Sequence, residues 1–264
     1  MNTSSDSGRV ALVTGGTDGI GKSIALALLH SGARVAVTGR RVEKGRELLD
    51  AAAAGDRLIF VESDALADGE PERVAAHVRD TLGRVEILVN NVGGGTGEYG
   101  RIDTIDPGAF RRGFDLNVMT AVTMTGAVLP QMIDGGWGRI LMVASVEGKL
   151  PTLPGIGPYV TAKHALIGLA KSVAFDCGEL GITCNTLCPG YVEIPTRVRT
   201  QSSSAGKANT GRYSNPQQNY QDLTRTGRHA TLDEVAHAAL SLLGEHSGAI
   251  TGTTLNVDGG SSPY

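Results

Sequence analysis

Seven short apolar runs, separated by longer stretches of a different periodicity, constrain the fold of this chain most strongly. The runs are rich in Val, Ile and Leu, and they span residues 9–14, 34–38, 57–61, 85–90, 138–145, 182–188 and 253–257. Their apolar character is continuous rather than alternating, which is typical of strands that are buried on both faces of a sheet. The sheet that they form must therefore be covered by other elements on each side.

The stretches between these runs have apolar residues three and four positions apart, a spacing that predicts helices. The predicted helices span residues 19–31, 42–54, 70–82, 110–134, 159–180 and 231–243. Alternation of strand and helix gives parallel strands joined by right-handed crossovers. We therefore expect the α/β class and a doubly wound Rossmann fold, with a seven-stranded parallel sheet and helices on both faces. It forms a single domain over residues 9–264, after a flexible tail at residues 1–8.

Composition excludes several functional classes. With 41% hydrophobic residues and a net charge of −3, the chain can bury a core and lacks the basic excess of a nucleic-acid binder. The N-terminus shows no signal-peptide pattern, and no run approaches the ~20 apolar residues of a membrane span. The three cysteines form no C-x-x-C pair, so we expect a reducing compartment, with buried free thiols at Cys184 and Cys188. The six histidines show no metal-ligand spacing. We expect a cytoplasmic protein that binds no nucleic acid, membrane or metal.

A glycine-rich turn follows the first predicted strand and leads directly into the first predicted helix. It has the pattern T-G-x-x-x-G-x-G and runs from Thr14 to Gly21. Small residues allow a tight turn whose backbone N–H groups approach a diphosphate, and the helix N-terminus adds a partial positive charge. We predict that the turn binds a nucleotide cofactor through Gly15, Thr17, Asp18, Gly19, Ile20 and Gly21.

A second motif places a phenol and an ammonium group on one face of a helix. Tyr159 and Lys163 are four residues apart at the start of the helix that follows the fifth predicted strand, and Ser145 closes that strand. Reduction of a ketone requires a proton for the oxygen, and tyrosine, with its ordinary pKa of ~10, is a suitable acid but a poor base near neutral pH. A neighbouring lysine favours the tyrosinate, and a serine hydroxyl can stabilise the developing oxyanion. This triplet is the predicted reaction centre.

Together these motifs resemble the short-chain dehydrogenase/reductase family, in its non-extended branch, over residues 9–260. The resemblance implies that Asn117 completes a catalytic tetrad with Ser145, Tyr159 and Lys163, and that Tyr159 and Lys163 also contact the cofactor. It further assigns cofactor contacts at the ends of later strands, to Asp64, Ala65, Asn91, Val92, Gly93, Pro189, Gly190, Val192 and Thr196. The interval of 14 residues from Ser145 to Tyr159 is one longer than in many relatives. We therefore expect an altered loop between them.

The end of the second predicted strand bears on the choice of cofactor. Enzymes that use NAD commonly have an acidic residue here for the ribose 2′-hydroxyl, whereas arginine accommodates a 2′-phosphate. This chain has Gly39 followed by Arg40 and Arg41, which favours NADP(H) over NAD(H). Asp18 is the contrary signal, because many NADP-preferring relatives have a basic residue at that position. Its alternative role is that of a helix N-cap.

The resulting functional hypothesis is an NADP(H)-dependent oxidoreductase that interconverts a secondary alcohol and a ketone, with Tyr159 as general acid and base. One alternative is a 3-oxoacyl-thioester reductase of the same family, and another is a non-catalytic nucleotide-binding regulator. Ser145, Glu147, Tyr159 and Tyr191 are the predicted substrate contacts, beneath a lid at about 194–225. The substrate itself is not specified by these residue types. The resemblance implies a homotetramer, or a homodimer, with helices 110–134 and 159–180 packing across subunits.

Overall fold

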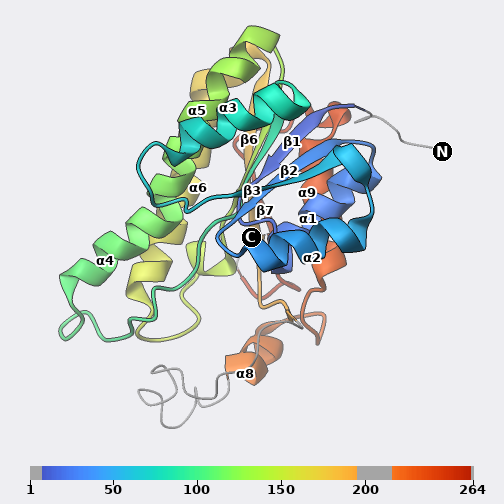
Figure 1. Cartoon of the computed structure of the whole chain (residues 1–264). Coiled ribbons are helices and arrows are strands. Elements are labelled where there is room, and N and C mark those ends of the chain that lie inside the picture. Colours follow the sequence, from blue (N-terminus) through green and yellow to red (C-terminus); the bar gives the residue numbers. More distant parts are fainter. Residues whose placement is uncertain (1–7, 195–215, 263–264) are drawn as a thin grey trace.

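The protein folds around one seven-stranded parallel sheet. The structure is a computed structural model that describes residues 8–194 and 216–262. The strands lie in the order β3-β2-β1-β4-β5-β6-β7 (Figure 1). Their bounds are β1 Val10–Val13, β2 Arg34–Gly39, β3 Leu58–Glu62, β4 Val85–Asn90, β5 Gly138–Val143, β6 Ile182–Pro189 and β7 Thr254–Val257. The predicted α/β class, strand number and parallel arrangement are confirmed.

The strand order reverses between β1 and β4, since the chain moves outward from β1 to β3 and then returns to the other side of β1. Loops that leave two neighbouring strands in opposite directions open a crevice at the carboxyl end of the sheet, where ligands bind in folds of this class. The glycine-rich turn follows β1, and the asparagine pair closes β4. The fold therefore brings two of the predicted motifs to this crevice.

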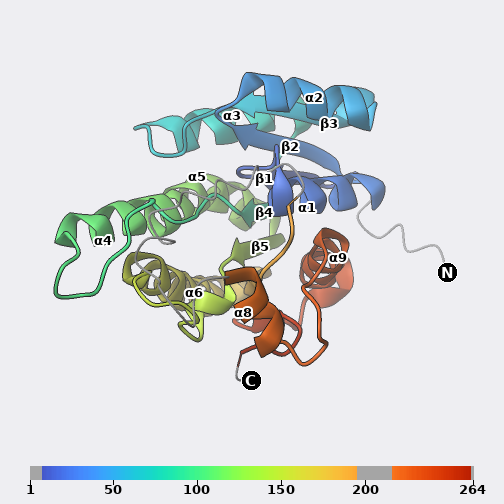
Figure 2. The ribbon, with the colours of Figure 1, turned by 90° about the horizontal axis from the view of Figure 1, so that it is seen from below.

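Helices cover the two faces of the sheet. One face is packed by α1 (Gly19–His30), α2 (Val42–Ala52) and α9 (Leu232–Leu243), and the other by α3 (Glu70–Leu82), α5 (Thr120–Gly135) and α6 (Gly157–Cys177) (Figure 2). Successive side chains of a strand point to opposite faces. In β1, Val10 and Leu12 pack with α3, α5 and α6, while Ala11 and Val13 pack with α1 and α9. This double burial explains why the strands are apolar throughout.

The predicted helix at residues 110–134 is longer and more complex than expected. It begins with α4 (Pro107–Phe114), where Asp106 caps the N-terminus by accepting a hydrogen bond from the Gly108 amide at 3.0 Å. A π-helical turn, η2 (Asp115–Met119), then joins α4 to α5. The complete run Pro107–Gly135 is long and apolar enough to span a membrane by those criteria alone. It packs against β4, α3 and α6, as a core helix of a water-soluble fold does.

Shorter elements complete the described part of the chain. They are the 3-10 turns η1 (Gly55–Arg57), η3 (Val146–Gly148), η4 (Gly178–Leu180) and η5 (Glu245–Ser247), together with α8 (Pro216–Leu223). Helix α8 was not predicted, because the polar stretch around it shows no helical period. The expected tail lies outside the described residues except for Gly8, and so does most of the expected lid, at residues 195–215.

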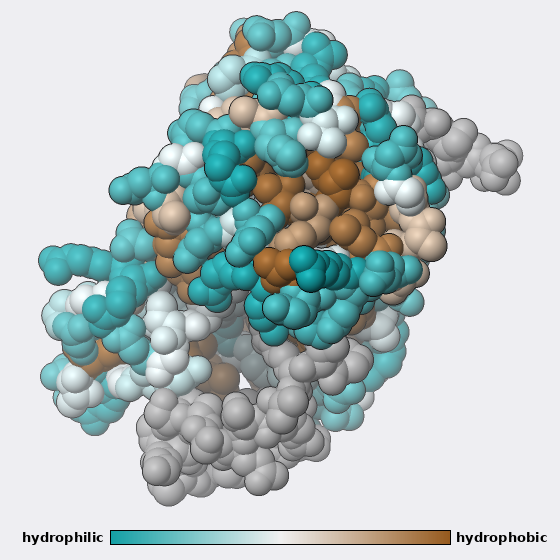
Figure 3. All heavy atoms as spheres, in the orientation of Figure 1, coloured by the Kyte–Doolittle hydropathy of each residue, from teal (hydrophilic) through white to brown (hydrophobic). Residues whose placement is uncertain are grey.

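The surface beside β3 is apolar (Figure 3), and the three cysteines lie in the core. Figure 3 shows apolar atoms gathered between α2 and α3, beside β3 at one edge of the sheet, where Ile59 and Phe60 are half-buried. In the core, Cys177, Cys184 and Cys188 are buried free thiols, as expected for the last two.

Candidate active site

The glycine turn after β1 is shaped by close backbone approach. Gly15 and Gly19 have φ angles of +62° and +53°, in the region that favours glycine. A Cβ atom at Gly16 would lie 2.7 Å from the Val37 side chain, and one at Gly21 would lie 2.4 Å from the Asn91 amide nitrogen. Side chains at these positions would push the turn away from the strands. The observed geometry instead leaves the N-terminus of α1 facing the crevice, which is the arrangement that binds a diphosphate.

Asn91 fastens this turn to the end of β4. Its side-chain amide donates to the Thr14 and Gly15 carbonyls at 3.0 and 3.1 Å, and its backbone N–H donates to the Thr14 hydroxyl at 3.0 Å. The Val92 side chain would lie 3.3 Å from a Cβ at Gly15. Both residues were predicted to contact the cofactor. The structure places them against the turn, with the Asn91 amide group engaged in holding it.

The end of β2 lies beside the same turn. A Cβ atom at Gly39 would lie 2.9 Å from the Thr17 hydroxyl oxygen, so an acidic side chain does not fit here without displacing Thr17. Asp18 is the N-cap of α1, accepting from the Gly19 amide at 2.9 Å, and it also forms an ion pair of 3.3 Å with Arg41. Its carboxylate charge is therefore offset by a guanidinium group. Arg40 is exposed at the edge of the crevice.

The predicted adenine contacts follow β3. Asp64 is exposed, and its carboxylate accepts a hydrogen bond from the Leu66 amide at 3.2 Å. Ala65 lines a narrow cavity together with Val92. The side chain of Asp64 thus stabilises the turn after β3, while Ala65 and Val92 contribute apolar surface to the cavity.

Asn117 lies at the centre of the π-helical turn and is fully buried. Its side-chain oxygen accepts from the Gly94 amide at 2.8 Å, and its side-chain nitrogen donates to the Gly94 and Gly113 carbonyls, both at 2.9 Å. Single π-helical turns inside α-helices are frequent at functional sites. Here the widened turn lets one side chain hold the loop after β4 against the helix.

Lys163 is buried in α6, four residues after Tyr159. Its ammonium group donates to the Val143 carbonyl at 2.9 Å and lies 5.6 Å from the centre of the Tyr159 ring. Burial lowers its pKa from 10.5 to about 8. A Cβ atom at Gly93 would lie 3.0 Å from the Lys163 nitrogen and 2.5 Å from the Asn117 side-chain oxygen. Lys163 and Asn117 therefore meet at Gly93, with Tyr159 beside them.

Ser145 follows β5 and caps the 3-10 turn η3. Its side-chain oxygen accepts a hydrogen bond from the Glu147 amide at 3.2 Å. The turn packs tightly on α6, since a Cβ atom at Gly148 would lie 2.8 Å from the Lys163 carbonyl oxygen. The four residues of the predicted tetrad thus come from η2, the β5 end and α6, and α6 contacts both η2 and β5.

The segment after β6 crosses the front of the crevice. Gly190 packs against Asp258, with 3.0 Å between a Cβ built at Gly190 and the Asp258 Cα atom. Val192 forms a parallel β-bridge with Ala230, and the Ile194 side chain reaches 3.0 Å from a Cβ position at Gly19, at the start of α1. The predicted cofactor contacts Pro189, Gly190 and Val192 lie on this segment, and Thr196 lies outside the described residues.

Glu147 and Tyr191 contact a residue that the sequence did not point to. The Tyr220 hydroxyl of α8 donates a short hydrogen bond to the Glu147 carboxylate, and the rings of Tyr191 and Tyr220 lie 5.9 Å apart. Tyr191 also packs against His229 at 4.7 Å. Tyr220 lies in a polar stretch and is 73 residues from Glu147 in the chain, so no local sequence pattern could predict that the two residues are in contact.

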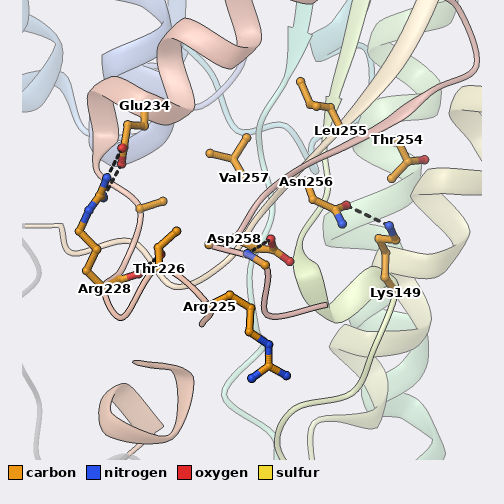
Figure 4. A pocket seen from close by; sticks show the side chains of 13 residues that line it. Lys149, Arg225, Thr226, Arg228, Glu234, Thr254, Leu255, Asn256, Val257 and Asp258 are labelled. Carbon is orange, nitrogen blue, oxygen red and sulfur yellow. Dashed lines mark hydrogen bonds and ion pairs between the residues drawn. The ribbon is translucent and has the colours of Figure 1, made fainter. Parts of the chain in front are cut away.

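A pocket of about 710 Å³ lies next to this site, between β7 and the segment at residues 225–230 (Figure 4). Lys149 reaches into it and donates to the Asn256 side chain at 3.0 Å, while Arg228 is paired with Glu234 at its far side. None of the tetrad residues lines this pocket. It is therefore separate from the predicted tetrad, although Asp258 borders both it and Gly190.

Comparison with known proteins agrees with this geometry. The sequence profile of short chain dehydrogenases matches residues 9–206. The chain belongs to the short-chain dehydrogenase family. It is 32% identical to D-beta-hydroxybutyrate dehydrogenase of Rhizobium meliloti over 262 residues, covering 96% of this chain and 98% of that protein. It is 34% identical to 2-(R)-hydroxypropyl-CoM dehydrogenase of Xanthobacter autotrophicus over 256 residues, covering 95% and 97% of the two chains.

Among solved structures, a variant of actinorhodin polyketide ketoreductase with NADPH is similar to this short-chain dehydrogenase at a TM-score of 0.87. The two share 31% identity, and the match covers 98% of this chain and 99% of that one. Membership in the family makes the protein an oxidoreductase that acts on CH–OH donors and has an NAD(P)-binding fold. The expectations of an enzyme, and of this family, are confirmed.

Proposed function

We propose that this short-chain dehydrogenase interconverts a secondary alcohol and a ketone, with NADP(H) as cofactor and Tyr159 as general acid and base. The observation that carries the proposal is the buried Lys163 ammonium beside the Tyr159 ring, in contact range of the loop at Gly93 and of Asn117. A buried lysine at this position has a cost in desolvation. A catalytic phenol that must ionise is a chemical reason to retain it.

Each residue of the tetrad has its own role in the proposed reaction. The nicotinamide cofactor, when bound, supplies or accepts the hydride at carbon. Tyr159 gives its proton to the ketone oxygen in reduction and takes it from the alcohol in oxidation, and the Lys163 ammonium stabilises the phenolate between these steps. The Ser145 oxygen already accepts from the Glu147 amide, so its own proton is free to be donated to the substrate oxygen. Asn117 acts as a positioning residue, because its side chain holds the Gly94 loop.

The preference for NADP(H) is supported by the β2 end. Thr17 lies against Gly39, so the acid that binds the ribose hydroxyls of NAD would have to displace Thr17. Arg40 is exposed beside that position, and Arg41 neutralises Asp18 through their ion pair. The one contrary residue thus adds no free negative charge near a 2′-phosphate. Guanidinium groups bind phosphate bidentately, which is the contact proposed for Arg40.

Absorbance at 340 nm tests the proposal directly. The protein is assayed with NADPH and with NADH against a panel of ketones, and a 3-oxoacyl thioester is included because of the likeness to a polyketide ketoreductase. Tyr159→Phe is expected to lower turnover by about 100-fold or more, the usual contribution of a positioned acid or base. Lys163→Met should act similarly, whereas Lys171→Met, on the exposed part of the same helix, is the matched control. A folded Tyr159→Phe variant that retains more than a few per cent of wild-type turnover would disprove the mechanism.

The assembly expected from the family also has support on the surface. Phe175 of α6 is 91% exposed, and Met119 and Ile133 of the neighbouring helical run are 39% and 40% exposed. We infer a homotetramer or homodimer in which α5 and α6 pack across subunits, since apolar side chains on a helix face favour burial. Light scattering that reports a monomer at micromolar concentration would reject this. A cytoplasmic location remains our expectation, in keeping with buried free thiols.

A further inference from the structure

Glu147 is a buried carboxylate next to the proposed reaction centre. It lies two residues after Ser145 in η3 and is only 2% exposed. Its oxygens accept hydrogen bonds from the Thr152 amide at 3.0 Å, from the Thr152 hydroxyl and from the Tyr220 hydroxyl. Among the described residues no lysine, arginine or histidine forms an ion pair with it. Within the described part of the chain, the hydrogen bonds to this carboxylate therefore come from neutral donors alone.

Tyr220 lies between this carboxylate and the surface. Its side chain is 9% exposed, and its ring packs near Tyr191, on the segment that crosses the crevice. Burial, followed by the charge of Glu147, holds the pKa of Tyr220 above its ordinary value, and Tyr159 also contributes in the same direction. The phenol of Tyr220 therefore remains a donor to Glu147. The Glu147 amide donates to the Ser145 hydroxyl oxygen at 3.2 Å, so Glu147 lies next to the proposed reaction centre.

The cationic groups near Glu147 are directed elsewhere. Lys149, two residues on, donates to Asn256 and points into the pocket of Figure 4. Lys163 donates to the Val143 carbonyl on the other side of η3. The field of a buried charge is weakly screened by salt and water, so it acts on a substrate group bound beside Ser145, which Glu147 contacts.

We infer that Glu147 is a specificity-determining residue: its carboxylate, held under Tyr220, selects uncharged carbonyl substrates and excludes those with a carboxylate or other anionic group near the ketone. This inference deepens the proposed function and rests on it. The relatives named above include a dehydrogenase of hydroxybutyrate, which is a carboxylate. A fixed negative group beside Ser145 discriminates by repulsion, an effective way to reject the wrong ligand. This chain would then differ from such relatives in substrate charge while sharing their chemistry.

Acetoacetate and its methyl ester form a matched pair, because they present the same ketone with and without a negative charge. The wild-type kcat/KM is expected to favour the ester by at least about tenfold, the ratio that corresponds to one modest charge repulsion. Glu147→Gln should bring the ratio close to one. The substitution fits the site: the Gln oxygen can accept from the Thr152 amide, and its nitrogen can donate to the Thr152 and Tyr220 hydroxyls, which rotate to accept.

Two further variants separate charge from contact. Tyr220→Phe removes the phenol but leaves the carboxylate, so the preference for the ester should persist while both rates fall. Glu179→Gln alters an exposed carboxylate before β6, at the opposite end of the strand, and should leave both the ratio and the rates unchanged. Unfolding curves followed by tryptophan fluorescence confirm that each variant is folded.

The outcomes are decisive in each direction. Similar wild-type values for acetoacetate and the ester, or an unchanged ratio in Glu147→Gln, would overturn the inference. Loss of the preference in Tyr220→Phe would also overturn it, because contact rather than charge would then be the cause. If no ketone is turned over, the proposed function fails instead. Calorimetric titration of the same two compounds then still measures charge selection, with the ester again expected to bind at least about tenfold more tightly.

Discussion

The buried amide of Asn117 gives a quantitative test of how the π-helical turn is held. Asn117→Asp conserves size and keeps the acceptor for the Gly94 amide, but it replaces the nitrogen that donates to the Gly94 and Gly113 carbonyls. A carboxylate oxygen would then face two carbonyl oxygens in a fully buried site. The folded protein must either tolerate that repulsion or protonate the new carboxyl group.

The structure sets the expected magnitude. Two lost hydrogen bonds contribute about 2 kcal/mol, and the desolvated carboxylate adds on the order of 1–3 kcal/mol near neutral pH. We expect a loss of about 3–5 kcal/mol in the free energy of unfolding at pH 7. Burial should raise the pKa of the new carboxyl group in the folded state above its unfolded value of ~3.9. The folded state then binds more protons between these two values, so the stability of the variant rises as pH falls through that window.

Urea unfolding, followed by fluorescence at fixed protein concentration, measures this effect. The single tryptophan, Trp137, directly precedes β5. The guanidinium carbons of Arg9 and Arg139 lie 3.6 and 4.3 Å from the centre of its ring, so its fluorescence reports on the packing at the start of β5. Relative to wild type, Asn117→Asp should lose less stability at pH 5 than at pH 7.5, whereas Asn117→Ala should lose a similar amount at both. A loss below about 1 kcal/mol, the value of a single hydrogen bond, would refute the reasoning. So would a loss that is independent of pH.

Three other predictions follow from local geometry. Gly39→Asp should shift the ratio of kcat/KM values from NADPH toward NADH, because a carboxylate repels the 2′-phosphate, and it should lower Tm because its Cβ meets Thr17. Gly126→Ala, in the interior of α5 with nothing within 4 Å, is the control: it should leave the cofactor ratio unchanged and should not lower Tm. The thiol of Cys188 is fully buried and burial raises its pKa to about 11, so an aromatic disulfide reagent at pH 8 should modify it only after unfolding in urea. The pKa of Lys163 is lowered to about 8 in the folded state, so between pH 8 and 10.5 the unfolded chain binds one more proton than the folded protein. The free energy of unfolding of the wild type should therefore rise across that window by on the order of 3 kcal/mol, relative to Lys163→Met, when both are measured by urea titration.

The fold was accessible from the sequence because the sheet is buried on both faces. Strand β4 and helix α3 have the predicted bounds, and the other predicted strands differ by one or two residues at their ends. The largest difference at a strand is at β5, which ends at Val143, while Ser145 serves as the cap of η3. That capping role is set by the Glu147 amide, a contact that apolar patterning does not encode.

Two features of the site could not be read from the chain. Residues Asp115–Met119 have an ordinary helical composition, so the π-helical turn depends on the Gly94 loop that Asn117 holds, and that loop lies 23 residues away in sequence. The partnership of Glu147 with Tyr220 spans an even longer interval, through a helix in a polar stretch of the chain. By contrast, the cap role of Asp18 was among the alternatives, and the structure confirms it while adding the ion pair with Arg41.

Gly93 shows why the buried residues of the proposed reaction centre depend on one another. The space that a single methyl group would occupy there is bounded by the Asn117 oxygen at 2.5 Å and by the Lys163 nitrogen at 3.0 Å. Asn117 is fixed by three hydrogen bonds to the neighbouring backbone, and Lys163 is fixed by the Val143 carbonyl. Neither can yield without losing a buried hydrogen bond, which has a cost of about 1–3 kcal/mol. Because Gly93 has no side chain, the buried Lys163 ammonium group and the buried Asn117 amide can both approach the loop at this position, and Lys163 can lie beside the Tyr159 ring.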